Sequence, residues 1–211
     1  MNLPSSNGKA FKGHAARNVD WDQPIEGGPT DVGFDYYHGI SASLDMPPYI
    51  HIENDRFQGR ATVTKAFHRK GAAHPDFEAI DVLPEIGRQA VDFIRRQDGS
   101  KPFFVYVPFT SPHTPILPTP EWQGKSPIGR YGDFQMQTDA VIGQIVAAVD
   151  AAGFTNNTVV IVTSDNGCSK AAKIDQMIKK ATTPAPTCAA PRPTSGTAGT
   201  GSSLSCAGPR P

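Results

Sequence analysis

The sequence lacks several features that would assign it to a class of protein at once. It has no excess of either charge, because 20 Lys and Arg residues balance 20 Asp and Glu residues, and this balance argues against nucleic-acid or membrane-surface partners. No apolar run is long enough to cross a bilayer, and the N-terminus lacks the apolar core of a signal peptide. The three cysteines fit no zinc or redox spacing. None of these features indicates a localisation.

The chain divides by composition into three parts. Residues 1–72 are rich in glycine, proline and aromatic residues with little periodicity, which predicts long loops. Residues 73–180 contain the periodic segments, and they predict an α/β core. Residues 181–211 contain no aromatic and no acidic residue, so this tail cannot bury enough apolar surface to fold, and we expect it to be disordered.

Two helices and two strands alternate in the middle part. A helical apolar period follows Asp81, a plausible cap, and ends before Gly99. An almost wholly apolar run at 103–107 predicts a central strand covered on both faces. A longer amphipathic helix within 130–154 leads to a second buried strand at 159–162. This order predicts a parallel pair of strands with a crossover helix, and hence a mostly parallel central sheet flanked by helices.

Polar residues follow each predicted strand directly. His113 lies in "TSPHTPILP" after the first, and Asp165 and Asn166 lie in "SDNG" after the second. Asp, Asn and Gly are typical of ordinary turns, and a proline-flanked histidine is often a surface residue. However, ligands of parallel sheets bind beyond the carboxyl ends of the strands. An imidazole beside oxygen ligands for a divalent cation would suit hydrolysis of an anionic ester.

The sequence from about Asn18 to Lys180 resembles the sulfatase family, most of all the arylsulfatases, in the alkaline-phosphatase-like superfamily. The segments that carry the resemblance are "GFDYYHGISASLDMPPYIHIENDR", "PFFVYVPFTSPHTPILPTPEWQGKSPIGRYGDFQMQTDAVIGQIV" and "NNTVVIVTSDNGCSKAAKIDQM". The resemblance implies a partial alkaline-phosphatase-like sandwich and a sulfuric ester hydrolase acting on a sulfated small molecule or glycan. It also implies that Asp165 and Asn166 ligate Ca²⁺ and that His113 contacts the sulfate ester in binding and catalysis. Full-length members are usually exported, to the periplasm or the lysosome.

Several parts of the family pattern are absent from this sequence. There is no Cys-x-Pro-x-Arg segment, whose cysteine becomes the formylglycine nucleophile, no early aspartate pair and no Gly-Lys-Trp-His segment. "CAAPR" at Cys188 and "CAGPR" at Cys206 carry their proline one place late. We therefore expect a fragment that lacks the N-terminal formylglycine region and the C-terminal part and is inactive alone, with Met1 an internal methionine. We also hypothesise that the tail is read in a shifted frame, because restoring one G before Ala181 permits a sulfatase-like continuation.

Two other functions remain open on the sequence. The chain could be a fragment of a related phosphodiesterase or phosphonate hydrolase, or a non-catalytic protein that binds anions or Ca²⁺. The upstream sequence would decide between the two kinds of hydrolase, and the missing nucleophile is the feature that separates binding from catalysis. The other polar residues receive structural interpretations. We expect Asp133 and Asp139 on the solvated face or in the first turns of a helix, and the remaining histidines in structural or surface positions: His38, His51, His68 and His74.

Overall fold

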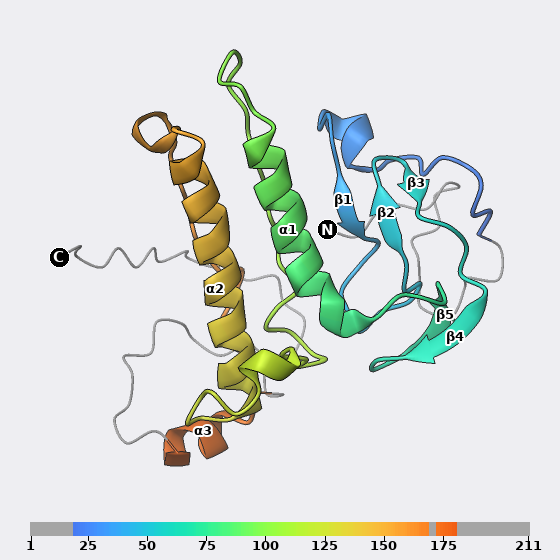
Figure 1. Cartoon of the computed structure of the whole chain (residues 1–211). Helices are drawn as coiled ribbons and strands as arrows, with labels where there is room; N and C mark the ends of the chain where they lie inside the picture. The colour runs from blue at the N-terminus through green and yellow to red at the C-terminus, as the bar shows by residue number, and fades with distance from the viewer. Residues whose placement is uncertain (1–18, 169–171, 181–211) are drawn as a thin grey trace.

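The computed structural model describes residues 19–168 and 172–180, and Figure 1 shows their arrangement. A region of short strands and turns lies on one side of α1, and α2 lies on the other. The elements are η2 (Pro29–Val32), β1 (His38–Ile40), β2 (His51–Glu53), β3 (Arg56–Phe57), β4 (Val63–Ala66), β5 (Lys70–Ala73), η3 (Ala79–Asp81), α1 (Val82–Arg95), η4 (Pro120–Trp122), α2 (Arg130–Ala151), η5 (Thr155–Asn157) and α3 (Ile174–Lys180).

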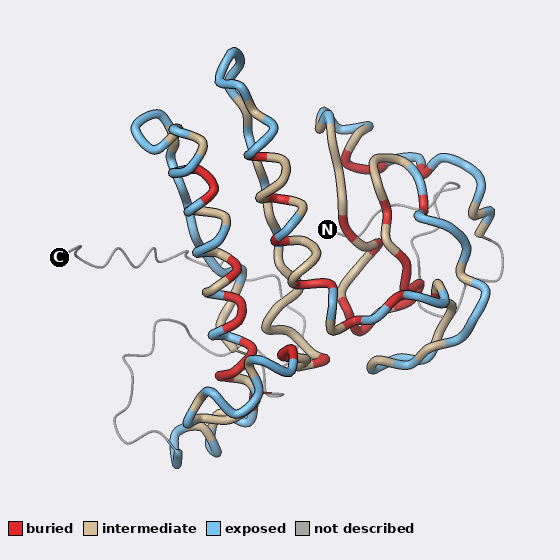
Figure 2. Tube along the Cα trace, in the orientation of Figure 1, coloured by how far each residue is buried: buried red, intermediate tan, exposed pale blue. Residues whose placement is uncertain are grey.

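The segment expected to form loops contains two small antiparallel sheets. Strands β1, β2 and β3 pair in that order, with Gly39 opposite Ile52, and β4 pairs with β5. A parallel bridge pairs Tyr49, just before β2, with Ala73 of β5, and so links the two sheets. Both of these residues are buried, and so is Ile52. Figure 2 shows that buried positions occur both in the strand region and along the two long helices. The strands are two to four residues long, too short for the periodic pattern by which longer strands are recognised.

The two predicted helices form where the apolar periodicity placed them. Asp81 occupies the N-cap position of α1, but its side chain makes no capping hydrogen bond. Helix α2 buries Phe134, Val141 and Val149 on one face. After its end, Gly153 adopts a left-handed φ of 78°, the conformation in which glycine commonly terminates helices.

Helices α1 and α2 pack side by side and run in the same direction. Near their N-terminal ends, Leu83 of α1 packs in one cluster with Phe134 of α2. Near their C-terminal ends, Ile94 of α1 packs with Val149 of α2. The helices approach closely at Gly87, where a Cβ atom would overlap the side chain of Val141. Residues of the following segments, including Phe109, Ile116 and Phe154, pack against this pair of helices.

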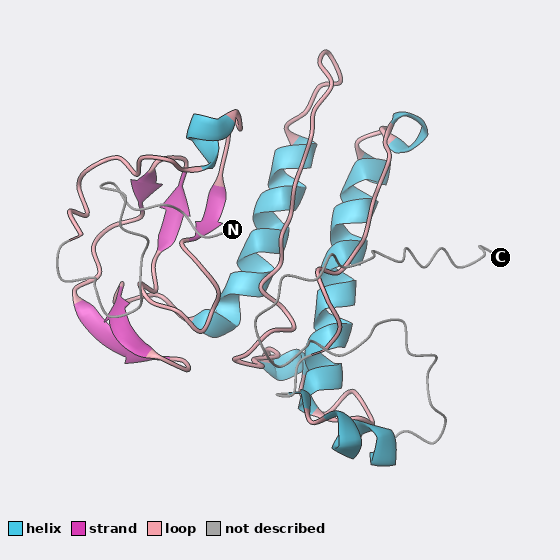
Figure 3. Cartoon of the chain, turned by 180° about the vertical axis from the view of Figure 1, so that it is seen from behind, coloured by secondary structure: helices cyan, strands magenta, loops and turns pink. Residues whose placement is uncertain are grey.

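The parallel central sheet predicted from the sequence is not formed among the described residues, where every sheet is antiparallel. Residues 103–107 and 159–162 return along the helices as extended segments outside any strand (Figure 3). The expectation that both are buried strands is therefore wrong here. The physical reason is that a strand needs hydrogen-bonding neighbours and apolar cover on its faces, and the described residues supply cover on one side at most.

Some expectations concern residues that the structure does not describe. Met1, Cys188, Cys206 and the tail from residue 181 onward all lie outside the described residues. Across residues 19–168 and 172–180, none of the helices combines the length and the apolar character that a membrane crossing requires.

Candidate functional site

The two extended segments deliver their loops to the same end of the helix pair. Phe103 packs against Phe93 and Phe154, near the C-terminal ends of α1 and α2, whereas Phe109 joins the cluster at their N-terminal ends. The second segment leaves the C-terminal end of α2 and reaches Cys168, close to Tyr131 in the first turn of that helix. Both segments therefore run antiparallel to the helices and parallel to each other, as the order of elements predicts.

The loop that carries His113 is anchored to buried side chains of α2. The hydroxyl groups of Ser111 and Thr138 lie 2.7 Å apart. The backbone N–H of Thr119 donates to the amide oxygen of Gln137 over 3.0 Å. Gln137 and Thr138 are both buried. Because these bonds hold the loop before and after the histidine, the rigid helix fixes where His113 lies.

His113 itself is half-buried and has a defined tautomer. Its Nδ1 lies 2.8 Å from the carbonyl oxygen of Thr114. A carbonyl can only accept a hydrogen bond, so Nδ1 carries the hydrogen in this contact. The Nε2 atom is therefore the one that this contact leaves for a ligand. It can accept a hydrogen bond when the ring is neutral and donate one when the ring is protonated.

Asp133 lies in the first turn of α2, one of the two positions expected for it, and not on the solvated face. Its side chain is buried and accepts hydrogen bonds from the backbone N–H groups of Gly124 and Ser126, over 3.0 and 2.7 Å. The carboxylate thus fixes the path of the loop between η4 and α2. Its place in the first turn is also the one that the helix dipole favours for an acid. Asp139, six residues further along α2, is exposed.

Asp165 and Asn166 form a turn at the end of the second extended segment. The hydroxyl of Ser164 donates to the carbonyl oxygen of Asn166 over 2.7 Å. Asp165 is exposed and Asn166 is half-buried. Burial, with the charge of Cys168 after this turn as a second cause, raises the pKa of Tyr131 in the first turn of α2 to about 12. Thr138, which holds the His113 loop, lies about 10 Å along the helix from Tyr131, and the second extended segment returns along α2 toward the same end (Figure 3).

The described residues do not form a complete calcium site. Asp165 and Asn166 carry the oxygen donors that Ca²⁺ prefers, but the ion takes about six to eight ligands. Within residues 19–168 and 172–180, no group of three or more His, Cys, Asp and Glu side chains is arranged to hold a metal ion. The donor chemistry fits calcium, whereas the number of donors does not.

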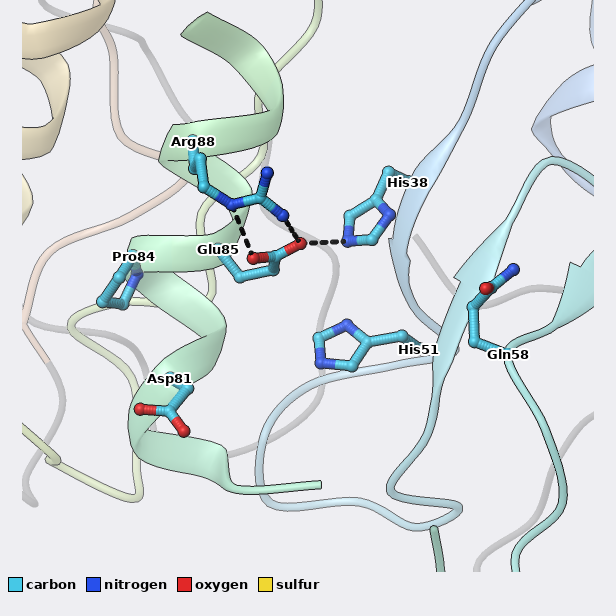
Figure 4. Close-up of a pocket in the computed structure, with 7 residues that line it drawn as sticks. All are labelled: His38, His51, Gln58, Asp81, Pro84, Glu85 and Arg88. Atoms are coloured by element: carbon cyan, nitrogen blue, oxygen red, sulfur yellow. Dashed lines mark hydrogen bonds and ion pairs between the residues drawn. The ribbon is translucent and has the colours of Figure 1, made fainter. Parts of the chain in front are cut away.

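A second cluster of polar residues lies on the opposite side of α1, facing the small sheet (Figure 4). It lines a cavity of about 430 Å³. Arg88 donates two hydrogen bonds to the carboxylate of Glu85, over 2.6 and 3.1 Å. The Nε2 atom of His38 lies 3.5 Å from the same carboxylate, an ion-pair distance without hydrogen-bond geometry. His51 stacks on His38 with ring centroids 5.5 Å apart.

Burial controls the protonation of this cluster. The Nε2 of His38 and the Nδ1 of His51 are buried without a hydrogen-bond partner. Burial lowers the pKa of both histidines, although the carboxylate of Glu85 opposes the effect. The sequence contained no signal for this pairing, because it depends on the antiparallel register of β1 and β2, two three-residue strands in a segment without periodicity.

Comparison with known proteins identifies the relatives of the chain. The family model named "Sulfatase" matches residues 20–191. An N-acetylgalactosamine-6-O-sulfatase of Bacteroides thetaiotaomicron is 28% identical over 206 residues, which cover 79% of this chain and 38% of the relative. The N-acetylgalactosamine-6-sulfatase of Canis lupus familiaris is 36% identical over 148 residues, which cover 67% of this chain and 27% of the relative.

A solved structure shares the fold. It comes from work on glycosaminoglycan metabolism by Bacteroides thetaiotaomicron, and it superposes with a TM-score of 0.66 at 24% identity. The superposition covers 77% of this chain and 43% of that one. The chain therefore spans less than half the length of these two Bacteroides proteins.

Proposed function

Because this chain belongs to the sulfatase family, we propose that it supplies the His113 side of the active site of a sulfuric ester hydrolase. The observation that carries the proposal is structural. The His113 loop is anchored to α2 at Thr138, and the segment that ends in the Asp165–Asn166 turn returns along the same helix toward its N-terminal end. Two loops with complementary chemistry at one end of a helix layer are what a site for an anionic ester requires.

His113 is the residue to which we assign a direct role in the reaction. The carbonyl of Thr114 orients its ring through Nδ1, so that Nε2 presents a fixed hydrogen-bonding position to a substrate. A protonated ring donates from Nε2 to an oxygen of the sulfate ester and stabilises the negative charge that develops as the ester bond breaks. The anchors to Gln137 and Thr138 keep this donor in place before substrate binds.

The residue that attacks sulfur is not among these 211 residues, because none of the three cysteines lies in Cys-x-Pro-x-Arg. Asp165 and Asn166 would contribute two oxygens toward Ca²⁺, and the remaining ligands would come from other residues. We therefore expect the purified chain to hydrolyse neither an aryl sulfate nor N-acetylgalactosamine 6-sulfate in excess Ca²⁺. The relatives named above make a sulfated glycan the first substrate to test.

A chimera tests the assignment directly. Residues 20–180 would replace the matching region of the Bacteroides N-acetylgalactosamine-6-O-sulfatase, which supplies the rest of the fold. We expect the chimera to cleave N-acetylgalactosamine 6-sulfate and His113→Ala to lower its kcat by about 10²–10³, the usual cost of losing one charge-stabilising donor. Lys125→Ala is the matched control, because Lys125 is exposed in the neighbouring loop. An active chimera whose turnover survives His113→Ala would refute the role of the histidine.

A further inference from the structure

The cavity between α1 and the small sheet has a buried floor and an exposed rim (Figure 4). His38 of β1 and His51 of β2 form the floor, and only 9% of the His38 side chain is exposed. Half-buried Glu85 and Pro84 of α1 form one wall. The rim carries three exposed residues: Gln58, Asp81 and Arg88. We refer to the space that these seven residues line as the histidine cavity.

Two nitrogen atoms on the floor indicate that the cavity holds a ligand. The Nε2 of His38 and the Nδ1 of His51 are buried, and neither has a hydrogen-bond partner among the described residues. The Nε2 of His38 lies 3.5 Å from the carboxylate of Glu85 without hydrogen-bond geometry. Buried polar atoms in folded proteins are almost always paired. A ligand that bonds to both histidines would satisfy this requirement.

The charges around the cavity disfavour an anion as that ligand. Glu85 and Asp81 each contribute a carboxylate, whereas Arg88 contributes the one positive charge. The guanidinium of Arg88 already donates hydrogen bonds to Glu85 and to Asp92. Burial lowers the pKa of both histidines from 6.5, so neither ring carries a positive charge at pH 7.5. A negatively charged ligand would therefore meet a net negative cavity.

A metal ion does not match the arrangement of donors either. Protein metal sites of the kind that use imidazole take three or four side-chain ligands. In the part of the chain that the structure describes, no three His, Cys, Asp or Glu side chains are arranged to hold an ion. The ligand that these groups fit is therefore neutral and polar.

A hydroxyl group has the hydrogen-bonding capacity that the floor requires. A neutral imidazole offers one N–H and one lone pair, and a carboxylate only accepts. A hydroxyl donates one hydrogen bond and accepts two, so it can donate to Glu85 while it accepts from a histidine. The cavity of about 430 Å³ is far larger than the share of one water molecule, about 30 Å³. It lies within the range of about 300–1,000 Å³ that is typical of ligand pockets.

We propose that the histidine cavity binds a neutral sugar unit through its hydroxyl groups. The buried nitrogens of His38 and His51 and the carboxylate of Glu85 contact the hydroxyls, and the ring of Pro84 contacts the apolar face of the sugar. The choice of a sugar rests on the proposed function, because the relatives are named as N-acetylgalactosamine sulfatases. Helix α1 lies between this cavity and α2, which anchors the His113 loop. The bound unit is therefore distinct from the one whose ester His113 contacts.

Nuclear magnetic resonance of the full 211-residue chain tests the proposal, with unsulfated N-acetylgalactosamine as the probe. At pH 7.5 the sugar should shift the imidazole signals of His38 and His51. We expect half of the shift at about 1 mM, the affinity of an ordinary ligand with about 15 non-hydrogen atoms. The signal of His68 should stay unchanged, because His68 is exposed and lies outside the cavity.

Matched substitutions test the role of the buried nitrogens. His51→Phe keeps an aromatic ring on the floor and removes both nitrogens, and it should weaken binding of the sugar at least about tenfold. His68→Phe makes the same change at an exposed position and should leave binding unchanged. Circular dichroism checks that both variants fold. The shifts in the unsubstituted chain test the proposal even if His51→Phe fails to fold.

Three results would overturn the proposal: no shift of His38 and His51 at about 20 mM sugar, twenty times the expected dissociation constant, equal shifts at His68, or full binding by a folded His51→Phe variant. A shift confined to His113 counts as the first of these, because it places the sugar in the other site. The probe carries no sulfate and the readout is binding, so this proposal can fail while the chimera described above remains active.

Discussion

Substituting alanine at Gly87 should destabilise the protein, although the same change at most helical glycines stabilises it. Alanine has the highest helix propensity, and replacing glycine inside a helix ordinarily gains about 1 kcal/mol. Gly87, however, is buried in α1 where α2 approaches it, and a Cβ atom there would overlap the Cγ1 methyl of Val141. Valine is branched at Cβ and its rotamer is restricted in a helix, so the methyl cannot swing away.

The sign of the effect follows from comparing the two magnitudes. Overpacking a close-packed core costs about 1–3 kcal/mol, and the middle of that range, about 2 kcal/mol, exceeds the gain in propensity of about 1 kcal/mol. We therefore expect Gly87→Ala to lower the free energy of unfolding by about 1 kcal/mol, equivalent to about 2–4 °C in melting temperature for a domain of this size. Gly143 of α2 is exposed, and a Cβ there would meet nothing within 4 Å. Gly143→Ala should accordingly stabilise by about 1 kcal/mol.

Urea unfolding followed by circular dichroism measures both variants. A double-mutant cycle with Val141→Ala isolates the contact, because removing the valine methyl groups makes room for the new Cβ atom. We expect the double variant to be more stable than the sum of the single effects by about 1 kcal/mol, a coupling typical of residues in contact. If Gly87→Ala stabilised the protein as much as Gly143→Ala, the helices would not be in the close contact that places the two extended segments.

Three further predictions concern the polar groups. Asp133→Ala should lower the free energy of unfolding by about 3 kcal/mol, because two buried backbone N–H groups lose a charged acceptor, whereas the exposed Asp139→Ala should stay within about 0.5 kcal/mol in the same urea assay. Burial lowers the pKa of His38 and His51 from 6.5, so the unfolded chain binds protons more readily than the folded one. Stability is then full above pH 6.5 and is lost as the pH falls from there through the lowered folded values. Urea unfolding at pH 7.5 and at pH 5.5 should show a loss of at most about 1.4 kcal/mol for each histidine, because pH 5.5 lies one unit below the unfolded pKa, and replacing both histidines with glutamine should reduce it. Calorimetric titration should find Ca²⁺ binding to the chain alone no tighter than about 1 mM, unchanged by Asp165→Ala, and tighter binding that this substitution abolishes would show a shell that the described residues do not reveal.

The helices were predictable from the sequence because the signal for them is local. The apolar stripe of α2 needs only its own residues to be recognised, and Phe134, Val141 and Val149 are buried as the period of 3.6 requires. The order of helices and extended segments was predictable for the same reason, and with it the common end at which the His113 loop and the Asp165 turn emerge.

The environment of Asp133 was not predictable, because an acid in the first turn of a helix looks the same in sequence whether it is exposed or buried. Its partners, the N–H groups of Gly124 and Ser126, are nine and seven residues upstream, and they reach it only through the path of the loop. The pairing of His38 with His51 likewise depends on strand register. In both places the deciding contact joins residues whose spacing follows no helical or strand period.

The two extended segments, residues 103–107 and 159–162, show a different limit, and it bears on catalysis. An apolar run such as 159–162 indicates that a segment should be buried, but it does not indicate which residues bury it. His113 and Asp165 follow the two extended segments directly, so their separation depends on the register between those segments, and no sheet sets that register within the described residues. Displacements of about 1 Å are enough to lower catalysis strongly. The inactivity expected of the chain alone therefore has two independent causes, the missing nucleophile and the missing sheet. A chimera that restores the rest of the fold but carries no nucleophile should slow amide exchange at His113 and Asp165 without producing turnover, and that result would separate the two causes.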